Sequence, residues 1–358
     1  MTPRLRLWEI EVQFLSPLVT ATGTYTGRRS VIVALDAEGS VGWGEAPAFP
    51  SGRAGTAEAA YATLCRPEIW IDGLPPVPIA AAAMQAARAD AAARSAGVPL
   101  HRHLGASGRP VPARTPLGIL DREQAAAEAN RLADRGVRAV KVKVAPDREL
   151  EPVGVLREGV PGLDIGVDAN GSYRDPGDDR LTALDAMGVS FIEQPFPAED
   201  LDSHAALRRR LQAVVALDES VPDEAAVRRA LAAGAAGRVA VKPNRAGLAA
   251  LRAILDLCSA AGVGVQVGGT FDTAIGRRHL LALATLPGVD DAAVGPPNGY
   301  LAADLAPYPD AVDGAVAPEE APGIGIDPDT ELLDRTCIRK AEVSLERAAL
   351  NPPRSAAP

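Results

Sequence analysis

The chain has few cysteines and no long apolar segment. Its three cysteines, Cys65, Cys258 and Cys337, are far apart and form no CxxC pair, which argues against a disulfide framework and indicates a reducing compartment. No segment approaches the ~20 apolar residues that cross a bilayer, and residues 1–14 lack the apolar core of a signal peptide. We therefore expect a cytoplasmic protein without membrane contact.

Basic tracts and the common catalytic fingerprints are also missing. The 37 Lys and Arg residues face 46 Asp and Glu residues, a net charge of −9, so nucleic acid is not an expected partner. GxSxG, HExxH, P-loop and Rossmann motifs do not occur. The histidines lie away from the predicted strand ends, and we interpret them as structural or surface residues: His101, His103, His204 and His279.

What the chain does contain is a set of regularly spaced charges. Lys143, Asp168, Glu193, Asp218 and Lys242 follow one another at intervals of 25, 25, 25 and 24 residues, each at the end of a short apolar run. Roughly 25 residues accommodate one strand, one helix and two loops. A polar residue that closes every strand is typical of a parallel β/α barrel with its active site at the C-terminal rim. The spacing therefore predicts both a fold and a site.

The strand and helix pattern agrees with such a barrel. Between the strands lie seven clear helical stretches, among them 121–136, 198–211, 223–235 and 246–262, and no convincing eighth helix follows. The strand runs are apolar on both faces, as parallel barrel strands are. The predicted strands are 114–120, 138–144, 164–170, 189–195, 214–219, 238–243, 263–269 and 291–295.

The N-terminal third has a different pattern. At 358 residues the chain exceeds a usual single domain, so a barrel with a smaller second domain is expected. Three strands are predicted at 5–14, 30–35 and 41–46, followed by helices near 55–66 and 78–97. The Gly/Thr-rich stretch 16–29 is predicted to be a loop long enough to act as a lid over the barrel.

Three of the spaced residues are carboxylates. Asp168, Glu193 and Asp218 close consecutive strands, so in a barrel they meet on one side of the rim, where their mutual repulsion calls for a divalent cation. Hard oxygen ligands suit Mg²⁺. The alternative is that each residue is a helix N-cap, which is common for one Asp after a strand but does not explain three at equal spacing.

Lysines flank the predicted metal site. Lys141 and Lys143 share one strand face, and the like charge makes Lys143 a candidate general base. Lys242 closes the sixth strand, across the barrel from the second. The two lysines could therefore address opposite faces of one substrate carbon. Solvated lysines at a strand end are the alternative, and the nearby acids disfavour it.

Other candidates are weaker. Asn170 shares the strand face of Asp168, and Glu219 follows Asp218 as a candidate partner of a lysine. Gly268, Gly269 and Thr270 end the seventh strand, where backbone N–H groups could hold an anion, although a simple turn is equally compatible. In the predicted lid, Arg28 is the candidate substrate contact, together with Thr22 and Tyr25.

The set of motifs closely resembles the enolase superfamily, specifically its muconate-lactonizing subgroup. The resemblance rests on segments along nearly the whole chain: GWGEAP (42–47), GVPLHRHLG (97–105), KVK (141–143), DAN (168–170), IEQP (192–195), DES (218–220), VKPNRAG (241–247), GGTFDTAIG (268–276) and PGIGID (322–327).

The resemblance implies a modified TIM barrel of eight strands and seven helices with an α+β capping domain. The capping domain would comprise residues 1–110 and a C-terminal return at 316–350, with the barrel at 111–315 and a frayed tail at 351–358. It also implies Mg²⁺ on Asp168, Glu193 and Asp218, and abstraction of a proton next to a carboxylate. The expected partner is a small-molecule carboxylate substrate; a monomer is compatible with the sequence, which leaves the oligomeric state open.

Within the subgroup the sequence looks most similar to o-succinylbenzoate synthases of menaquinone biosynthesis. Dipeptide epimerases are expected to carry an Asp-x-Asp after the eighth strand, where AVGPPNGY (293–300) has no acid. None of the histidines is placed to serve as the base of the mandelate-type branch. Asp272 departs from the resemblance, because Glu is more usual there. The alternative activity is N-acylamino acid racemization, or that of another epimerase or a cycloisomerase of the subgroup. A non-catalytic metal-binding barrel is the alternative outside the enzymes.

Overall fold

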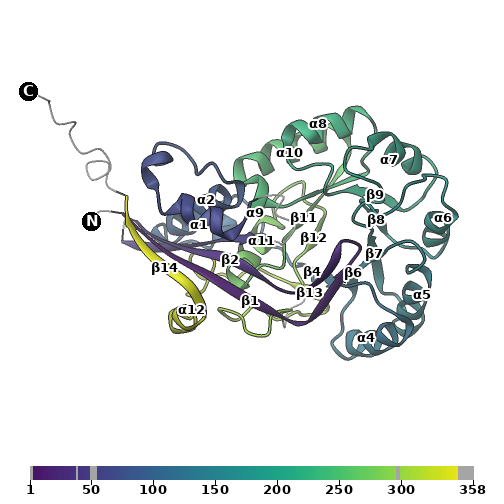
Figure 1. Ribbon diagram of the computed structural model, residues 1–358, viewed down its shortest axis with the longest axis horizontal. Helices are drawn as coiled ribbons and strands as arrows, with labels where there is room; N and C mark the ends of the chain where they lie inside the picture. The colour runs from purple at the N-terminus through teal and green to yellow at the C-terminus, as the bar shows by residue number, and fades with distance from the viewer. Residues whose placement is uncertain (1–2, 38, 49–54, 296–298, 346–358) are drawn as a thin grey trace, which may run out of the picture.

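The computed structural model describes residues 3–37, 39–48, 55–295 and 299–345 and consists of an antiparallel sheet domain beside a parallel barrel (Figure 1). The predicted tail at 351–358 and part of the predicted segment 293–300 lie outside these residues. Within the described ranges, every helix is too short or too polar to traverse a lipid bilayer.

Eight parallel strands form the barrel in sequence order. Near-closure is made beside the first and last strands, where Ala113 forms a bridge with Ala293 and the Gly295 N–H donates to the Arg114 carbonyl at 3.2 Å. The strands are β5 (Thr115–Leu117), β6 (Ala139–Lys143), β7 (Asp164–Asp168), β8 (Phe191–Glu193), β9 (Val214–Leu217), β10 (Arg238–Val241), β11 (Gly264–Gly268) and β12 (Asp291–Ala293). The predicted order and number of strands are confirmed.

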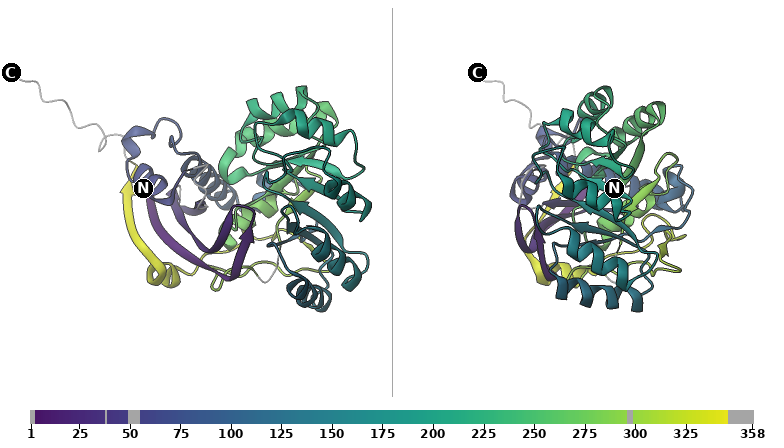
Figure 2. Two further views of the ribbon diagram at one scale, coloured as in Figure 1. Left: turned by 45° about the vertical axis from the view of Figure 1, so that its right-hand side comes forward. Right: turned by 90° about the vertical axis from the view of Figure 1, so that its right-hand side faces the viewer.

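Helices cover the outside of this sheet (Figure 2). One main helix follows each of the first seven strands, and the described residues between β12 and β13 form no eighth helix, as predicted. A one-turn helix, α9 (Pro243–Ala246), precedes the helix after β10. The main helices are α4 (Arg122–Asp134), α5 (Leu150–Gly159), α6 (Asp179–Ala186), α7 (Leu201–Arg208), α8 (Glu224–Ala232), α10 (Leu248–Ala261) and α11 (Ala274–Leu283).

Strand β6 shows how the two faces of a barrel strand divide. Val140 and Val142 are fully buried and share a hydrophobic cluster with Leu132 of α4. Because side chains alternate along a strand, Lys141 and Lys143 point to the inside of the barrel. Packing of the outer face against the helices therefore fixes the direction of both lysines.

The floor of the barrel is filled by one aromatic ring and two arginines. The guanidinium of Arg114 lies 5.1 Å from the centre of the Phe191 ring and that of Arg238 lies 5.4 Å from it. Gly166 makes room for the ring, since a Cβ there would meet Phe191 at 2.1 Å. Arg114 donates to Asp291 and is also paired with Asp164 at 2.6 Å. The end of the barrel away from the predicted site is thus closed by paired charges.

The second domain is a four-stranded antiparallel sheet in the order β14-β1-β2-β3. The C-terminal strand returns to the first one, with Arg4 opposite Ser344, so the two ends of the described chain lie side by side (Figure 1). The strands are β1 (Arg4–Thr20), β2 (Gly23–Ala37), β3 (Ser40–Ala48) and β14 (Cys337–Ser344), with α1 (Ala57–Leu64), η1 (Pro67–Ile69), α2 (Pro78–Ser95) and α12 (Thr330–Thr336) beside them. Short elements connect the domains: α3 (Leu100–His103), β4 (Val111–Pro112) and β13 (Ala315–Val316).

The predicted loop at 16–29 is wrong, because these residues extend β1 and β2 into a hairpin. Leu18 pairs with Tyr25 and Thr20 with Gly23, after a register shift between Gln13 and Leu18. The β-branched and aromatic residues favour a strand, and the Thr20 hydroxyl closes the turn by donating to the Gly23 carbonyl at 3.1 Å. The hairpin is fixed to the barrel, since the Ile119 N–H donates to the Val19 carbonyl at 2.8 Å.

Candidate active site

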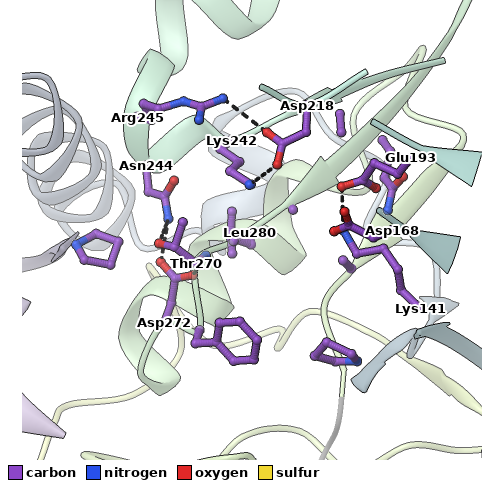
Figure 3. Close-up of a pocket in the computed structure, with 18 of the residues that line it drawn as sticks. Lys141, Asp168, Glu193, Asp218, Lys242, Asn244, Arg245, Thr270, Asp272 and Leu280 are labelled. Atoms are coloured by element: carbon purple, nitrogen blue, oxygen red, sulfur yellow. Dashed lines mark hydrogen bonds and ion pairs between the residues drawn. The ribbon is translucent and has the colours of Figure 1, made fainter. Parts of the chain in front are cut away.

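Strand ends bring the three predicted carboxylates to one place. Asp168 and Glu193 end β7 and β8 as direct partners in the ladder, and Asp218 follows β9. The three residues are 2 % exposed or less. They lie on the cavity that opens at the C-terminal rim (Figure 3). The sequence prediction that these side chains converge therefore agrees with the geometry.

Lysine ammonium groups lie against these carboxylates. Lys141 Nζ is 2.7 Å from Glu193 Oε1 and 3.3 Å from Asp168 Oδ2. Lys143 Nζ donates to Asp168 Oδ2 at 2.7 Å. Lys242, which follows β10, forms an ion pair with Asp218 (Figure 3). All three lysines line the cavity, so cations approach the group of three acids from both sides of the barrel.

The charges in this cluster shift one another's pKa values. Burial alone would raise the pKa of Asp168, but the neighbouring Lys143 and Lys141 outweigh it and hold the pKa below its ordinary value. The pKa of Asp218 is also below its ordinary value, because attraction to Lys242 and then to Arg245 outweighs the effect of burial. Glu193 differs: burial raises its pKa to about 7 despite Lys141, because Asp168 and Asp218 add repulsion. The negative charge of Glu193 is therefore less well compensated by nearby cations than the charges of Asp168 and Asp218.

The fit to a divalent cation rests on the donor set. The buried Glu193 Oε2 has no hydrogen-bond partner, and three carboxylates of adjacent strands are the oxygen ligands that Mg²⁺ prefers. Among the described residues, no three acids, histidines or cysteines form a ready metal-ligand group, and Lys141, Lys143 and Lys242 lie against the carboxylate oxygens. The acids fit a hard cation in the type of their donor atoms and in their shared position at the rim.

Asn170 and Glu219 join this cluster, but Glu219 is bonded to Asn170 and not directly to a lysine as predicted. Asn170 accepts from Lys143 Nζ at 2.8 Å through Oδ1 and donates to Glu219 Oε1 at 3.1 Å. Burial and the neighbouring Asp218 raise the pKa of Glu219. Asn170 has a positive φ of 46°, which places its side chain beside Lys143 as the chain leaves β7.

Two residues of α9 were missed by the sequence analysis. Arg245 donates to Asp218 Oδ1 at 3.3 Å, and Asn244 donates to Thr270 Oγ1 at 3.0 Å and to Asp272 Oδ1 at 2.8 Å. The available signal was their place two and three residues after Lys242, since α9 is one turn long and keeps the side chains near the rim.

The predicted anion site at the end of β11 is partly occupied by the chain itself. Gly268, Gly269 and Thr270 line the cavity, but the Thr270 N–H donates to Asp272 Oδ2 at 2.7 Å. A Cβ at Gly269 would meet the same oxygen at 2.1 Å, so glycine is needed for this close approach. The Thr270 N–H is therefore not available to a substrate anion, contrary to our expectation.

Arg28 is also placed differently from our expectation. Its guanidinium is fully buried against Glu45 Oε1 at 2.6 Å and donates to the Phe271 carbonyl at 2.6 Å, and it is not among the residues that line the cavity. Glu45 accepts from the N–H groups of Thr273 and Gly276 at the start of α11. Arg28 and Glu45 thus join the sheet domain to the barrel rather than contacting a substrate.

The rest of the cavity wall is mainly apolar. The hairpin contributes Leu18, Thr20 and Thr22, so this part of the predicted lid does reach the site, whereas Tyr25 is not in the wall. No histidine of the described residues lines the cavity, which agrees with their interpretation as structural or surface residues. The main apolar residues are Leu18, Pro47, Ile79, Pro116, Leu280, Phe271 and Tyr300.

Comparison with known proteins identifies the family. Residues 124–332 match the family described as enolase C-terminal domain-like. The chain belongs to the enolase superfamily. It is 30% identical over 359 residues to an o-succinylbenzoate synthase of Geobacillus stearothermophilus, with 92% of this chain and 94% of that protein covered. It is equally similar to an N-succinylamino acid racemase of Thermus thermophilus, at 31% identity with 93% and 96% covered.

Solved structures of this superfamily share the whole architecture. An enolase superfamily member from Listeria innocua superimposes with a TM-score of 0.86 at 25% identity, covering 96% of this chain and 99% of that one. A dipeptide epimerase of Cytophaga hutchinsonii, complexed with Mg and a dipeptide, has a TM-score of 0.83 at 20% identity, covering 96% and 100%. The barrel and its capping sheet are therefore the fold of the superfamily.

Proposed function

We propose that this protein is an o-succinylbenzoate synthase of menaquinone biosynthesis. The reaction converts 2-succinyl-6-hydroxy-2,4-cyclohexadiene-1-carboxylate to 2-succinylbenzoate and water. The observation that carries this proposal is the placement of Lys143 and Lys242 on opposite strands, each in contact with one of the three buried acids. The similarity to o-succinylbenzoate synthases over 92% of the chain supports the choice of substrate.

Asp168, Glu193 and Asp218 are the residues that would hold Mg²⁺. When bound, the cation supplies positive charge near the substrate carboxylate, on which negative charge grows as the neighbouring C–H bond breaks. With the cation bound, Asp168 would share its charge between the cation and Lys143. Lys143 would keep Asn170 Oδ1 as a partner, which would hold its amine toward the substrate.

Lys143 carries the proton in both steps. Its amine takes the ring proton at C1, and the electron pair of the broken C–H bond passes to the carboxylate. The resulting ammonium then gives that proton to the C6 hydroxyl, so the C–O bond breaks and water leaves from the same face. Lys242 stabilises the developing negative charge from the opposite side and moves no proton. The aromatic product makes the second step easy.

N-succinylamino acid racemization is the second candidate function. The racemase of Thermus thermophilus is as similar to this chain as the synthase, and a 1,1-proton transfer would use both Lys143 and Lys242 as acid and base. In a non-catalytic barrel, by contrast, lysines buried against acids would have no use.

The test compares the two reactions on one preparation. With Mg²⁺ present, conversion of the cyclohexadiene precursor is followed beside racemization of a panel of N-succinylamino acids. We expect a higher kcat/KM for the precursor. A rate for an N-succinylamino acid far above that for the precursor would change the assigned activity from synthase to racemase. Inactivity toward both substrates would contradict both assignments.

A further inference from the structure

Three polar side chains form a hydrogen-bonded group across the cavity from Glu193 and Lys141. They are Asn244, Thr270 and Asp272 (Figure 3). We propose that the Thr270 hydroxyl donates a hydrogen bond to an uncharged carbonyl oxygen of the substrate and so selects acyl-bearing carboxylates. This inference rests on the proposed function and names the feature of the substrate that this side of the cavity recognises.

Asp272 fixes the direction of the hydrogen bonds in this group. Its Oδ2 accepts from the Thr270 N–H at 2.7 Å, and its Oδ1 accepts from Asn244 Nδ2 at 2.8 Å. A carboxylate only accepts, so the amide nitrogen of Asn244, not its oxygen, must point at Asp272. The second hydrogen of that nitrogen goes to Thr270 Oγ1 at 3.0 Å.

The direction of these bonds leaves one donor for a ligand. The Thr270 oxygen accepts from Asn244, so its own proton is left to donate, and no residue that the structure describes accepts it. Thr270 lines the cavity. Strand β11, which precedes it, is four positions from β7 in the eight-stranded order, so Thr270 lies across the barrel from Asp168. A substrate with its carboxylate near Asp168 would extend toward this hydroxyl.

The adjacent charge decides which acceptor suits this position. Asp272 is buried beside Thr270, and a second carboxylate of the substrate at the same place would be repelled by it. A ketone or amide carbonyl is an acceptor without charge. In the cyclohexadiene precursor and in an N-acylamino acid, the carbonyl carbon is two bonds from the carbon that loses its proton. One hydroxyl can therefore serve both substrates.

The test is a binding measurement with the product of the proposed reaction and one analogue that differs from it only at this carbonyl. Dissociation constants are measured by calorimetry, with Mg²⁺, for 2-succinylbenzoate and for 4-(2-carboxyphenyl)butanoate, in which a methylene group replaces the ketone. For the wild type we expect 2-succinylbenzoate to bind about 3- to 10-fold more tightly, the effect of one neutral hydrogen bond. Thr270→Val should reduce that ratio to about 1, and Thr270→Ser should restore it, because serine keeps the hydroxyl.

Thr20→Val is the matched control, since Thr20 also lines the cavity but its hydroxyl already donates to the Gly23 carbonyl. It should leave the ratio of dissociation constants unchanged. An unchanged ratio in Thr270→Val, a wild-type preference for the methylene analogue, or no binding of 2-succinylbenzoate would overturn the proposal. Precursor turnover is measured separately: a protein that shows the expected ratio but no dehydration contradicts the proposed function alone.

Discussion

The rim and the floor of the barrel both hold buried ion pairs, but they use different cations. At the floor, Arg114 and Arg238 pair with Asp291 and lie against the Phe191 ring. At the rim, the acids pair mainly with Lys141, Lys143 and Lys242. Arginine is planar, keeps its charge and holds a fixed geometry, whereas lysine is a compact cation that can give up a proton.

The acids at the floor and at the rim also differ in how completely their carboxylate oxygens are paired. Asp291 at the floor interacts with both arginines, while Glu193 at the rim has an oxygen without a partner and a pKa raised to about 7, chiefly by burial. At the floor both oxygens of the buried acid have arginine partners, although Arg238 Nε has none among the described residues. The unpartnered carboxylate oxygen at the rim is what the proposed cation would complement.

Loss of an acid at the rim should have the largest effect on activity. Asp168→Ala, Glu193→Ala and Asp218→Ala should each abolish dehydration, because the cation loses a ligand, while the folded state persists. EDTA should do the same reversibly. Turnover assays and thermal unfolding check this, with the exposed Asp256→Ala on α10 as the control. Full turnover in metal-free buffer would contradict the metal site.

Loss of Lys143, the proposed proton carrier, should have the next largest effect on activity. Lys143→Ala should lower kcat by at least roughly 10²- to 10⁴-fold, because the general base and the general acid are the same amine. Binding of 2-succinylbenzoate should change much less than kcat. Steady-state kinetics and calorimetry on the same sample separate the two effects. A Lys143→Ala variant with near wild-type kcat would remove this residue from the mechanism.

Removal of a charged side chain at the floor should lower the stability of the protein without changing its catalytic rate. Arg114→Met removes the partner of Asp164 and one of the two arginines that pair with Asp291, while Arg238 remains, and should lower the free energy of unfolding by about 1–3 kcal/mol. The kcat of the remaining folded protein should be unchanged. Urea unfolding measures this, with Arg122→Met as the control, since its ion pair with Glu151 is exposed and should contribute less than about 1 kcal/mol.

A smaller effect should appear in the pH dependence of stability without metal. The pKa of Glu193 is raised to about 7, so the folded state binds its proton more tightly than the unfolded state does. The contribution is fully present below the ordinary Glu pKa and is lost as the pH rises toward 7. Thermal unfolding of the metal-free wild type and Glu193→Gln from pH 4 to 8 checks this. An identical pH dependence in the two proteins would contradict it.

Much of this could be predicted from the sequence because it rests on period and alternation. The 25-residue spacing from Lys143 to Asp218 predicted successive barrel strands, and alternation placed Lys141 beside Lys143. These local patterns set which side chains face inward, so they predict the residues of the rim without any knowledge of the contacts.

Contacts between distant segments could not be predicted in the same way. Arg28 is bound to Glu45 and to the Phe271 carbonyl, and nothing near position 28 in the sequence announces these partners. The predicted loop at 16–29 is a hairpin, because Gly and Thr are compatible with both a loop and paired strands. Asp272 occupies the anion site at Thr270 through a turn with Phe271 at a φ of 61°, a conformation that the residue types do not indicate.

The division of labour between the two lysines can be tested by turning one rim pair into a pair of the floor type. The measurement is the rate of 2-succinylbenzoate formation by Lys242→Arg beside Lys242→Ala, with product binding measured in both. If Lys242 contributes only charge, the rate of Lys242→Arg should be at least about tenfold higher than that of Lys242→Ala, although arginine differs from lysine in size. Equal inactivity of the two variants, with folding and product binding intact, would contradict this and assign a proton transfer to Lys242.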